Sequence, residues 1–254
     1  MDNPQEVHLI RYADGAFTST SAVLPYEYSV TLIVNGKAWM EMICTPSNLQ
    51  ELAVGFLYNE DLINSREEIK HVFACDSSDA IEVETVHPIQ KPSSWVRTTG
   101  CSGGQTSRRL EFSQPLALKE LTLSAEALGE VIRGFAVEQS RVSSSRGTHC
   151  SGLYDGNAWL AIAEDIGRHN TLDKLMGHIL LHKPSASPAL LITTGRISSE
   201  MLQKAARIGS SILVSFTSPN LFTVSLAKAW GMTLVGYARP AGFNIYCGAE
   251  RITR

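Results

Sequence analysis

The sequence predicts an α/β protein built in two parts, a small α+β roll followed by a larger α/β domain with a largely parallel sheet. In the first part, an Asn-Gly turn joins two β-rich runs between residues 29 and 44, and further strands accompany one helix. In the second part, strands alternate with helices of roughly ten residues, which is typical of βαβ units. A segment rich in proline and glycine separates the two patterns, so we expect domains at 1–115 and 116–254.

The first part is expected to contain one helix among short strands. Asn35-Gly36 suits a type I′ turn and therefore predicts a hairpin. Asn48, followed three residues later by Glu51, marks the start of a helix whose apolar side chains share one face. Strands are expected at 6–12, 29–34, 37–44, 70–75 and 80–87.

The second part repeats an order of strand and helix. A turn at 155–157 lies between two β-rich runs and predicts a second hairpin. The helices carry apolar residues at helical spacing, such as Leu128, Val131 and Phe135 in the first of them. Helices are expected at 124–135, 172–179, 199–208 and 221–230, and strands at 150–154, 158–163, 189–193, 212–216, 233–238 and 243–248.

Composition argues against several classes of partner. The chain has 254 residues, 44% hydrophobic and 19% charged, and its formal net charge of −3 gives no general positive field for nucleic acid or an anionic membrane. The first ten residues lack the apolar core of a signal peptide, and no run approaches the ~18 apolar residues of a membrane-spanning helix. The five cysteines form no C-x-x-C pair, which argues against a zinc ribbon and favours a reducing cytoplasm.

A stretch at 96–109 places Cys101 among three glycines and three arginines. Glycine frees the backbone, so the stretch predicts an exposed loop, and nearby guanidinium groups would lower the pKa of the thiol. The alternative is a flexible linker with an incidental cysteine, which composition by itself slightly favours. Cys44, Cys75 and Cys150 adjoin apolar strand residues and are expected to be buried and inert.

Three arginines follow three expected strands of the second part. Ligands of α/β sheets collect beyond the carboxyl ends of the strands, which is where Arg168, Arg196 and Arg239 are placed. Arginine side chains and helix N-termini there would suit a diphosphate. Each segment alone also fits ordinary capping and turn chemistry, but the three together favour an anion site.

Two histidines, His149 and His169, adjoin the same segments. They are expected either to hold loops by hydrogen bonds or to line the same cleft. No metal site is predicted, because His149 is followed by Cys-Ser and not by the H-x-E pattern of zinc deaminases.

The last expected strand alternates between apolar and polar residues. One face would belong to the core, and the other would offer an amide, a phenol and a bare backbone to a nucleotide. The apolar face is expected to carry Phe243, Ile245 and Cys247, and the polar face Asn244, Tyr246 and Gly248.

Specific motifs occur in order along most of the chain. They are T-P-S-N-L-Q-E-L-A-V-G-F-L-Y-N-E, T-T-G-C-S-G-G, G-T-H, D-I-G-R-H-N-T-L-D-K, T-T-G-R-I-S-S-E-M-L-Q-K-A, S-F-T-S-P, L-V-G-Y-A-R and F-N-I-Y-C-G. From about residue 24 to residue 252, the chain thereby resembles the formate dehydrogenase accessory sulfurtransferase family, FdhD/NarQ.

The resemblance implies a role in maturing a molybdenum or tungsten formate dehydrogenase. Sulfur would pass as a persulfide from a cysteine desulfurase to a loop cysteine, which corresponds to Cys101, and then to the metal of bis-molybdopterin guanine dinucleotide. The cofactor-binding segment corresponds to Phe243–Gly248, and the C-terminal fold to a cytidine-deaminase-like three-layer α/β domain without zinc. Gly104 stands where some relatives carry a second loop cysteine, which puts a two-thiol relay in doubt and leaves a single-cysteine relay.

We therefore expect a cytoplasmic sulfurtransferase with Cys101 as nucleophile and sulfur carrier. Its expected partners are a cysteine desulfurase, the formate dehydrogenase catalytic subunit, and the molybdenum cofactor or a guanine nucleotide. The expected cofactor-binding residues are Arg168, Arg196, His149, His169 and the segment 243–248. The alternative is a non-catalytic cofactor chaperone or guanine-nucleotide-binding module in which Cys101 is idle. The sequence leaves open whether the protein forms a homodimer.

Overall fold

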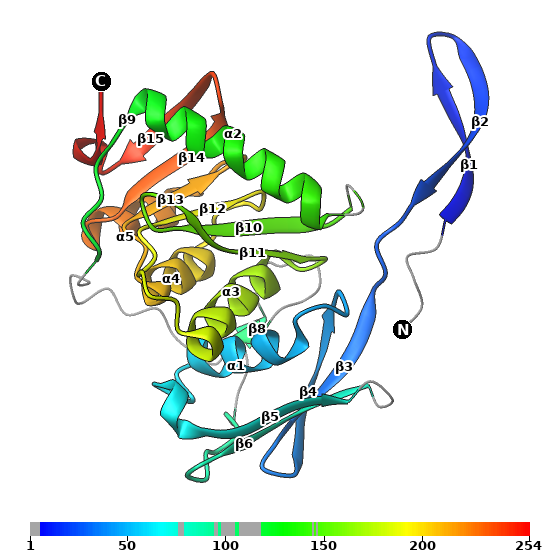
Figure 1. Cartoon of the computed structure of the whole chain (residues 1–254), viewed down its shortest axis with the longest axis vertical. Coiled ribbons are helices and arrows are strands. Elements are labelled where there is room, and N and C mark those ends of the chain that lie inside the picture. The colour runs from blue at the N-terminus through cyan, green and yellow to red at the C-terminus, as the bar shows by residue number, and fades with distance from the viewer. Residues whose placement is uncertain are drawn as a thin grey trace.

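The computed structural model describes residues 6–75, 79–93, 96–97, 105–106, 118–143, 145 and 147–254. Two apolar cores lie on opposite faces of the sheet of a C-terminal α/β unit, and a third lies between the sheet and helix of a smaller N-terminal unit (Figure 1). Both kinds of unit expected from the sequence are therefore present. None of the helices in this described part is long and apolar enough to cross a membrane.

A six-stranded sheet forms the middle layer of the C-terminal unit, in the order β11-β10-β12-β13-β14-β15. Helix α2 covers one face, and α3, α4 and α5 cover the other, so the unit has three layers (Figure 1). The elements are β9 Leu123–Ser124, α2 Ala125–Val142, β10 His149–Tyr154, β11 Trp159–Asp165, α3 Arg168–His182, β12 Leu190–Thr193, α4 Ser199–Ile208, β13 Ile212–Ser215, α5 Leu221–Ala229, β14 Thr233–Arg239, β15 Gly242–Cys247, the 3₁₀ helix Ala249–Arg251 and β16 Ile252–Thr253.

Side-chain caps explain where three of these helices begin. The side chains of Ser124, Ser198 and Asn220 each accept a hydrogen bond from a backbone N–H in the first turn of α2, α4 and α5. Helix α4 ends at Gly209, whose φ of 93° is readily adopted only by glycine. These local signals account for the agreement between the expected and observed positions of the helices.

The sheet is parallel only at its centre, where β12, β13 and β14 run side by side in the same direction. The pairs β10–β11, β10–β12 and β14–β15 are antiparallel, so the prediction of a largely parallel sheet was wrong. The reason is that only α4 and α5 form crossovers between neighbouring parallel strands. The turns at 155–158 and 240–241 are too short for a crossover and produce hairpins.

The N-terminal unit is a four-stranded sheet in the order β4-β3-β6-β5, with α1 packed on it. A separate hairpin, β1–β2, projects away from this body (Figure 1). Its second strand was not predicted, although Asp14 and Gly15 both have positive φ and form its turn. The elements are β1 Glu6–Ala13, β2 Ala16–Val23, β3 Tyr28–Val34, β4 Lys37–Cys44, α1 Leu49–Asn59, the 3₁₀ helix Arg66–Glu68, β5 Ile69–Cys75 and β6 Ala80–Thr85.

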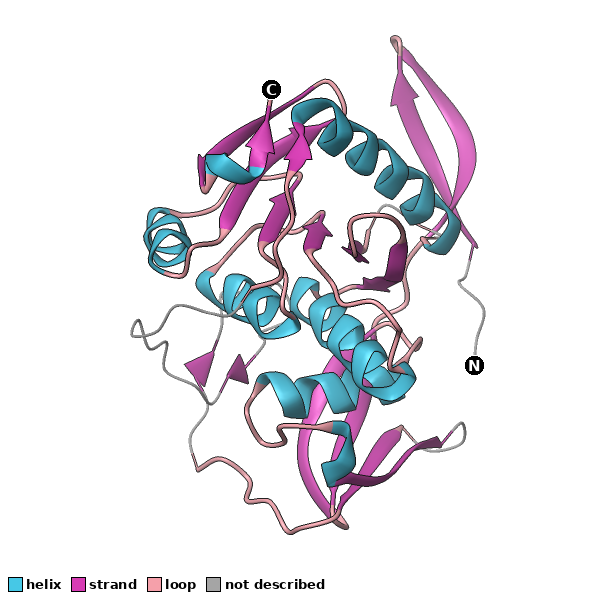
Figure 2. Ribbon diagram, turned by 60° about the vertical axis from the view of Figure 1, so that its left-hand side comes forward, coloured by secondary structure: helices cyan, strands magenta, loops and turns pink. Residues whose placement is uncertain are grey.

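Helices α1 and α3 join the two units, and helices fill the space between the two sheets (Figure 2). The helices approach so closely that a Cβ added at Gly55 would overlap the carbonyl oxygen of Asp173. A Cβ at Gly177 would likewise overlap the backbone of Glu51. Two glycines therefore set the contact between the units. The expected boundary at residue 115 falls outside the described residues and stays a prediction.

Candidate functional site

The parallel strands β12, β13 and β14 end at one edge of the sheet, which we call the carboxyl edge. Strand β11 also ends at this edge, at Asp165, and the antiparallel β10 begins there, at His149. The pairing of Ser151 with Thr193 fixes His149 just beyond the end of β12. His149 thus lies where ligands of α/β sheets bind.

Arg168 and Arg196 lie together at the carboxyl edge, close to His149. Gly195 packs directly against Arg168, since a Cβ at Gly195 would lie 2.9 Å from the Cβ of Arg168. Burial lowers the pKa of His149, and the positive charges of Arg168 and Arg196 lower it further, against the opposing effect of Asp165. Arg168 is 4% exposed, whereas Arg196 is open to solvent. The structure thus places two positive charges beside a largely neutral imidazole.

His169 occupies the first turn of α3 beside Arg168 and is 8% exposed. Its Nε2 lies 3.3 Å from Oε2 of Glu200, in the first turn of α4. Burial lowers the pKa of His169, and the nearby carboxylate of Glu200 only partly opposes this. The imidazole therefore lies between the starts of two helices and favours its neutral form.

Asp165 links the carboxyl edge to the N-terminal unit. One carboxylate oxygen accepts hydrogen bonds from the backbone of Gly167 (2.8 Å) and the amide of Asn170 (2.9 Å). The other lies 2.7 Å from Nζ of Lys174, which is 1% exposed, and accepts from the backbone N–H of Thr45 at 3.1 Å. Much of the D-I-G-R-H-N-T-L-D-K motif therefore holds the two units together, while Arg168 and His169 belong to the carboxyl edge.

Loops after β12, β13 and β14 continue the carboxyl edge. Ile197 pairs with Pro219, which aligns the first two loops. The backbone N–H of Tyr237 donates to the carbonyl of Thr217 at 2.8 Å, which joins the second loop to β14. The first two loops and the last residues of β14 consequently form one continuous row along the ends of the strands.

Arg239 does not lie with the other two arginines. Its guanidinium donates to the carbonyl oxygens of Phe216 (3.1 Å) and Ala238 (2.7 Å) and stands over the Phe216 ring. Phe216 packs against the core on the α2 side of the sheet. The prediction of three arginines around one anion is therefore corrected to two, because the guanidinium of Arg239 binds backbone carbonyl oxygens and the Phe216 ring at the end of β13.

The alternation predicted for the last strand is wrong for Ile245 and Tyr246. Ile245, expected in the core, is 36% exposed, whereas Tyr246, expected outside, packs with Cys247 against the core on the α3–α5 side. The pairing of β14 with β15 shifts register between Leu234 and Val235, and this irregularity interrupts the alternation of faces. Phe243 does pack against a core, on the α2 side.

The segment 243–248 is also divided between the two ends of the sheet. Asn244 pairs with Gly236 near the carboxyl edge and is exposed. Gly248 lies at the opposite end, where its φ is 68° and its carbonyl accepts from the hydroxyl of Thr233 at 2.7 Å. A Cβ at Gly248 would lie 2.6 Å from that hydroxyl oxygen, so this glycine is needed for packing. Only the first half of the segment can share a site with the arginines.

The carboxyl edge is long enough for a dinucleotide-sized ligand. His149 and Asn244 lie on β10 and β15, four strand positions apart in the sheet. At roughly 4.8 Å per strand this is about 19 Å. Positive charge lies at one end of this distance, and an exposed amide lies at the other.

Cys101 lies outside the described residues, so its structural prediction stays open. The short strands β7 (Val96–Arg97) and β8 (Gln105–Thr106) on either side of it pair in antiparallel fashion. Cys44 and Cys150 are buried, as expected, and burial raises the pKa of each thiol to about 12. The side chain of Cys75 is not among those described.

Comparison with known proteins decides the family. The model of the FdhD/NarQ family matches residues 25–253. This chain belongs to the FdhD/NarQ family. Two similar relatives of known name are the sulfur carrier proteins FdhD of Bacillus subtilis, 33% identical over 249 residues, and of Staphylococcus aureus strain MRSA252, 34% identical over 252 residues. Those alignments cover 95% and 96% of this chain, and 95% and 94% of the relatives.

A solved structure shares the fold of this FdhD/NarQ chain. It is a protein from Desulfotalea psychrophila described as a formate dehydrogenase accessory protein, with a TM-score of 0.79 and 28% identity. The match covers 98% of both chains, so the N-terminal unit, the C-terminal unit and the way they pack are all shared.

Sequence reasoning missed two residues that organise the site of this FdhD/NarQ protein. Glu200 lies beside His169, and Lys174 neutralises the buried Asp165. Both residues occur inside motifs, T-G-R-I-S-S-E and D-I-G-R-H-N-T-L-D-K. The charged residues at helical spacing in these motifs are the sequence feature that could have pointed to them. Their partners could not be identified because each lies on a different element.

Proposed function

We propose that this chain is a sulfur carrier in the maturation of a formate dehydrogenase and that it acts as a sulfurtransferase. Cys101 accepts sulfur from a cysteine desulfurase and passes it to the molybdenum of bis-molybdopterin guanine dinucleotide, in a reducing cytoplasm. Two observations support this role. The chain belongs to the FdhD/NarQ family, and it aligns over nearly its whole length with relatives that are named sulfur carrier proteins.

The chemistry of the three other cysteines whose side chains are described, Cys44, Cys150 and Cys247, is the observation that carries the choice of Cys101. A sulfur carrier needs a thiolate, yet burial raises the pKa of the Cys44 and Cys150 thiols to about 12. The pKa of Cys247 is also raised by burial, and its Sγ lies 3.4 Å from the Met232 carbonyl. Cys101 instead lies among glycines and arginines in the sequence, where the thiolate is favoured.

The transfer is a simple displacement. The Cys101 thiolate attacks the outer sulfur of the desulfurase persulfide, the S–S bond breaks, and the desulfurase thiolate leaves with the electron pair. Cys101 then carries the persulfide. Its outer sulfur reaches the metal as sulfide by taking two electrons from the reduced metal, and the Cys101 thiolate is regenerated.

The carboxyl edge would hold the pterin nucleotide during this transfer. Arg168 and Arg196 supply positive charge for phosphate groups, and the neutral imidazoles of His149 and His169 supply hydrogen bonds without adding charge. Asn244 can donate to and accept from a base. Of the segment 243–248 that the sequence predicts to bind the cofactor, only the first half, which contains the exposed Asn244, is proposed to contact it.

Mass spectrometry tests the carrier directly. The purified chain is incubated with a cysteine desulfurase and cysteine, and Cys101 should gain ~32 Da, the mass of one bound sulfur. Cys101→Ala should gain nothing, whereas Cys247→Ser is a matched control that should be labelled like the parent chain. Formate dehydrogenase produced with Cys101→Ala should be assembled but inactive.

The rival is a non-catalytic cofactor chaperone or guanine-nucleotide-binding module. It requires that Cys101 stays unmodified and that Cys101→Ala supports normal formate dehydrogenase activity. Either of these two results would contradict the carrier proposal.

A further inference from the structure

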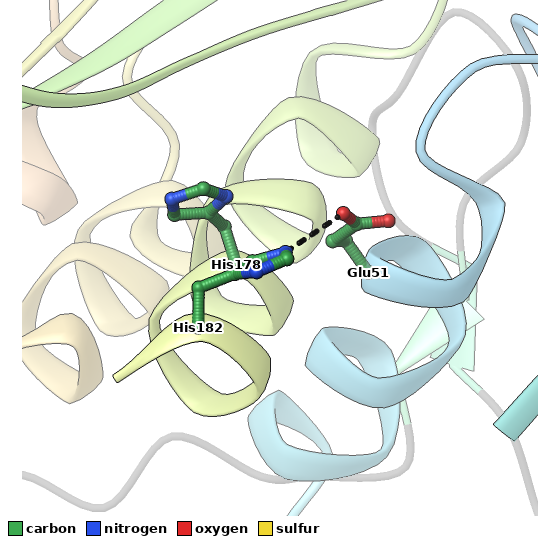
Figure 3. Close-up of side chains that lie close together, drawn as sticks. All are labelled: Glu51, His178 and His182. Carbon is green, nitrogen blue, oxygen red and sulfur yellow. Dashed lines mark hydrogen bonds and ion pairs between the residues drawn. The ribbon is translucent and has the colours of Figure 1, made fainter. Parts of the chain in front are cut away.

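Three side chains outside the carboxyl edge form a group with metal-binding chemistry. They are Glu51 on α1 and His178 and His182 on α3, and one ligand atom of each lies within 4.8 Å of the others. Figure 3 shows the imidazole of His182 directed at Glu51 and the imidazole of His178 beside it, one turn earlier on α3. The group lies beside the crossing of α1 and α3, where the N-terminal and C-terminal units meet.

The spacing of the two histidines suits chelation. His178 and His182 are four residues apart on α3, so helical geometry places them on one face. Their ring centroids are 4.4 Å apart with an interplanar angle of 38°. Ligand atoms of the two rings lie within 4.8 Å of each other, and rotation of the side chains would direct a nitrogen of each ring at one ion.

The third ligand is positioned by the backbone. Gly177, which precedes His178, packs so closely on α1 that any Cβ would overlap the backbone of Glu51. The carboxylate of Glu51 therefore emerges next to the histidine pair, and its Oε1 lies 3.3 Å from Nε2 of His182. Two ligand atoms bound to tetrahedral zinc at about 2.0–2.1 Å lie roughly 3.3 Å apart, so this pair is already at the required separation.

The charges around the group also suit a cation. The neighbouring Lys183 does not point its charge at the group, because its Nζ pairs with Glu67 at 2.6 Å. About half of the His182 side chain is exposed, so an ion can enter from solvent.

We propose that Glu51, His178 and His182 bind a divalent transition metal, with Zn²⁺ as the best fit, and that the ion ties α1 to α3. Two histidines and one glutamate are a recurrent zinc ligand set, which leaves a fourth position for water. The sequence predicts no metal here, because it contains no cysteine pair or deaminase motif and these three residues are brought together only by the packing of α1 on α3. This site is separate from the carboxyl edge, because His178 and His182 lie in the second half of α3 and Arg168 lies at its start.

Zinc titration of the full chain, after removal of metals with a chelator, tests the proposal. The parent chain should bind zinc at this site and melt at a higher temperature when zinc is present. His182→Ala and His178→Ala should lose this binding or weaken it by at least about tenfold, the lower limit even for changes in outer-shell partners. His71→Ala removes an exposed histidine on β5 and should bind zinc like the parent chain.

Two further measurements distinguish this site from a cysteine-bound metal and from a simple ion pair. Glu51→Gln removes the charge but keeps a hydrogen-bonding group. It should weaken zinc binding and leave the melting temperature of the metal-free chain nearly unchanged. Co²⁺ should give visible bands without the charge-transfer band of a cobalt–thiolate, which excludes binding by cysteine. Equal zinc affinity in the parent chain, His178→Ala and His182→Ala would overturn the proposal and leave an ordinary Glu51–His182 ion pair.

Discussion

At the scale of single residues, surroundings decide what identical side chains do. Arg168 and Arg196 both adjoin His149, but Arg168 is buried under Gly195 and Arg196 is open to solvent. Arg239 is the last residue of β14, and it hydrogen-bonds to the carbonyl of Phe216 and stands over its ring. Arg196 is therefore the arginine that can meet a ligand with least disturbance of the fold.

Substitution of Arg196 tests this difference. Arg196→Ala should weaken guanine nucleotide binding roughly ten- to a hundredfold, the value of a charged hydrogen bond, without lowering the melting temperature. Arg196→Lys should also weaken binding, because lysine keeps the charge but loses the planar fork. Titration at fixed salt measures both. Unchanged affinity in both variants would place the phosphate elsewhere.

At the scale of elements, the crossing of α1 and α3 depends on two glycines. Gly55 and Gly177 let the helices touch through their backbones, and the apolar face of α1 contributes to the N-terminal core together with Leu180 and Leu181 of α3. The buried pairs Asp165–Lys174 and Asp173–Lys204 lie on or beside α3. Closeness of the helices thus sets the geometry of the Glu51 group.

Gly55→Ala should destabilise the protein by about 3 kcal/mol or more, because the added Cβ meets backbone that has no room to move. Gly134→Ala is the matched control, since Gly134 lies in α2 and its Cβ would make only an ordinary 3.6 Å contact with Trp159. That substitution should stabilise by about 0.5–1 kcal/mol through helix propensity. Denaturant unfolding measures both, and equal effects would mean that the helix contact is not tight.

At the scale of the whole molecule, buried histidines make folding sensitive to mild acid. Burial lowers the pKa of both His149 and His169 below the usual 6.5, so the unfolded chain binds protons more readily than the folded one. Their contribution to stability is complete above about pH 6.5 and is lost as the pH falls through the folded-state pKa values.

The melting temperature should therefore fall between pH 7.5 and about pH 5.5 in the presence of a chelator. His169→Gln should reduce this fall, because it removes one group that must be protonated. His71→Gln, which changes an exposed histidine, should leave the fall unchanged. Measurements stop near pH 5.5, because carboxylates become protonated at lower pH and then no longer form ion pairs. Glu67, for example, has a pKa of about 2 instead of 4.5 because Lys183 lies beside it. An identical pH profile for His169→Gln and the parent chain would refute this role of His169.

The sequence by itself determined the helices, most strands and the family. The turn at Asn35-Gly36 and the caps at Ser124 and Asn220 act within a few residues, so they can be read without the rest of the chain. The grouping of motifs at strand ends also correctly placed Arg168, Arg196 and His149 at one edge. Local signals and the general rule for α/β sheets were sufficient for these features.

Only the tertiary structure decided which faces and ends of the elements meet. The irregular pairing of β15 turned Tyr246 toward the core, against which it packs, and left Ile245 at the surface, because register depends on the neighbouring strand and not on alternation in one strand. Arg239 found its partner in the preceding strand. Glu51 met His178 and His182 across more than a hundred residues of chain because two glycines allow α1 and α3 to touch. Contacts over such distances depend on packing, which the periodicity of a single segment does not contain.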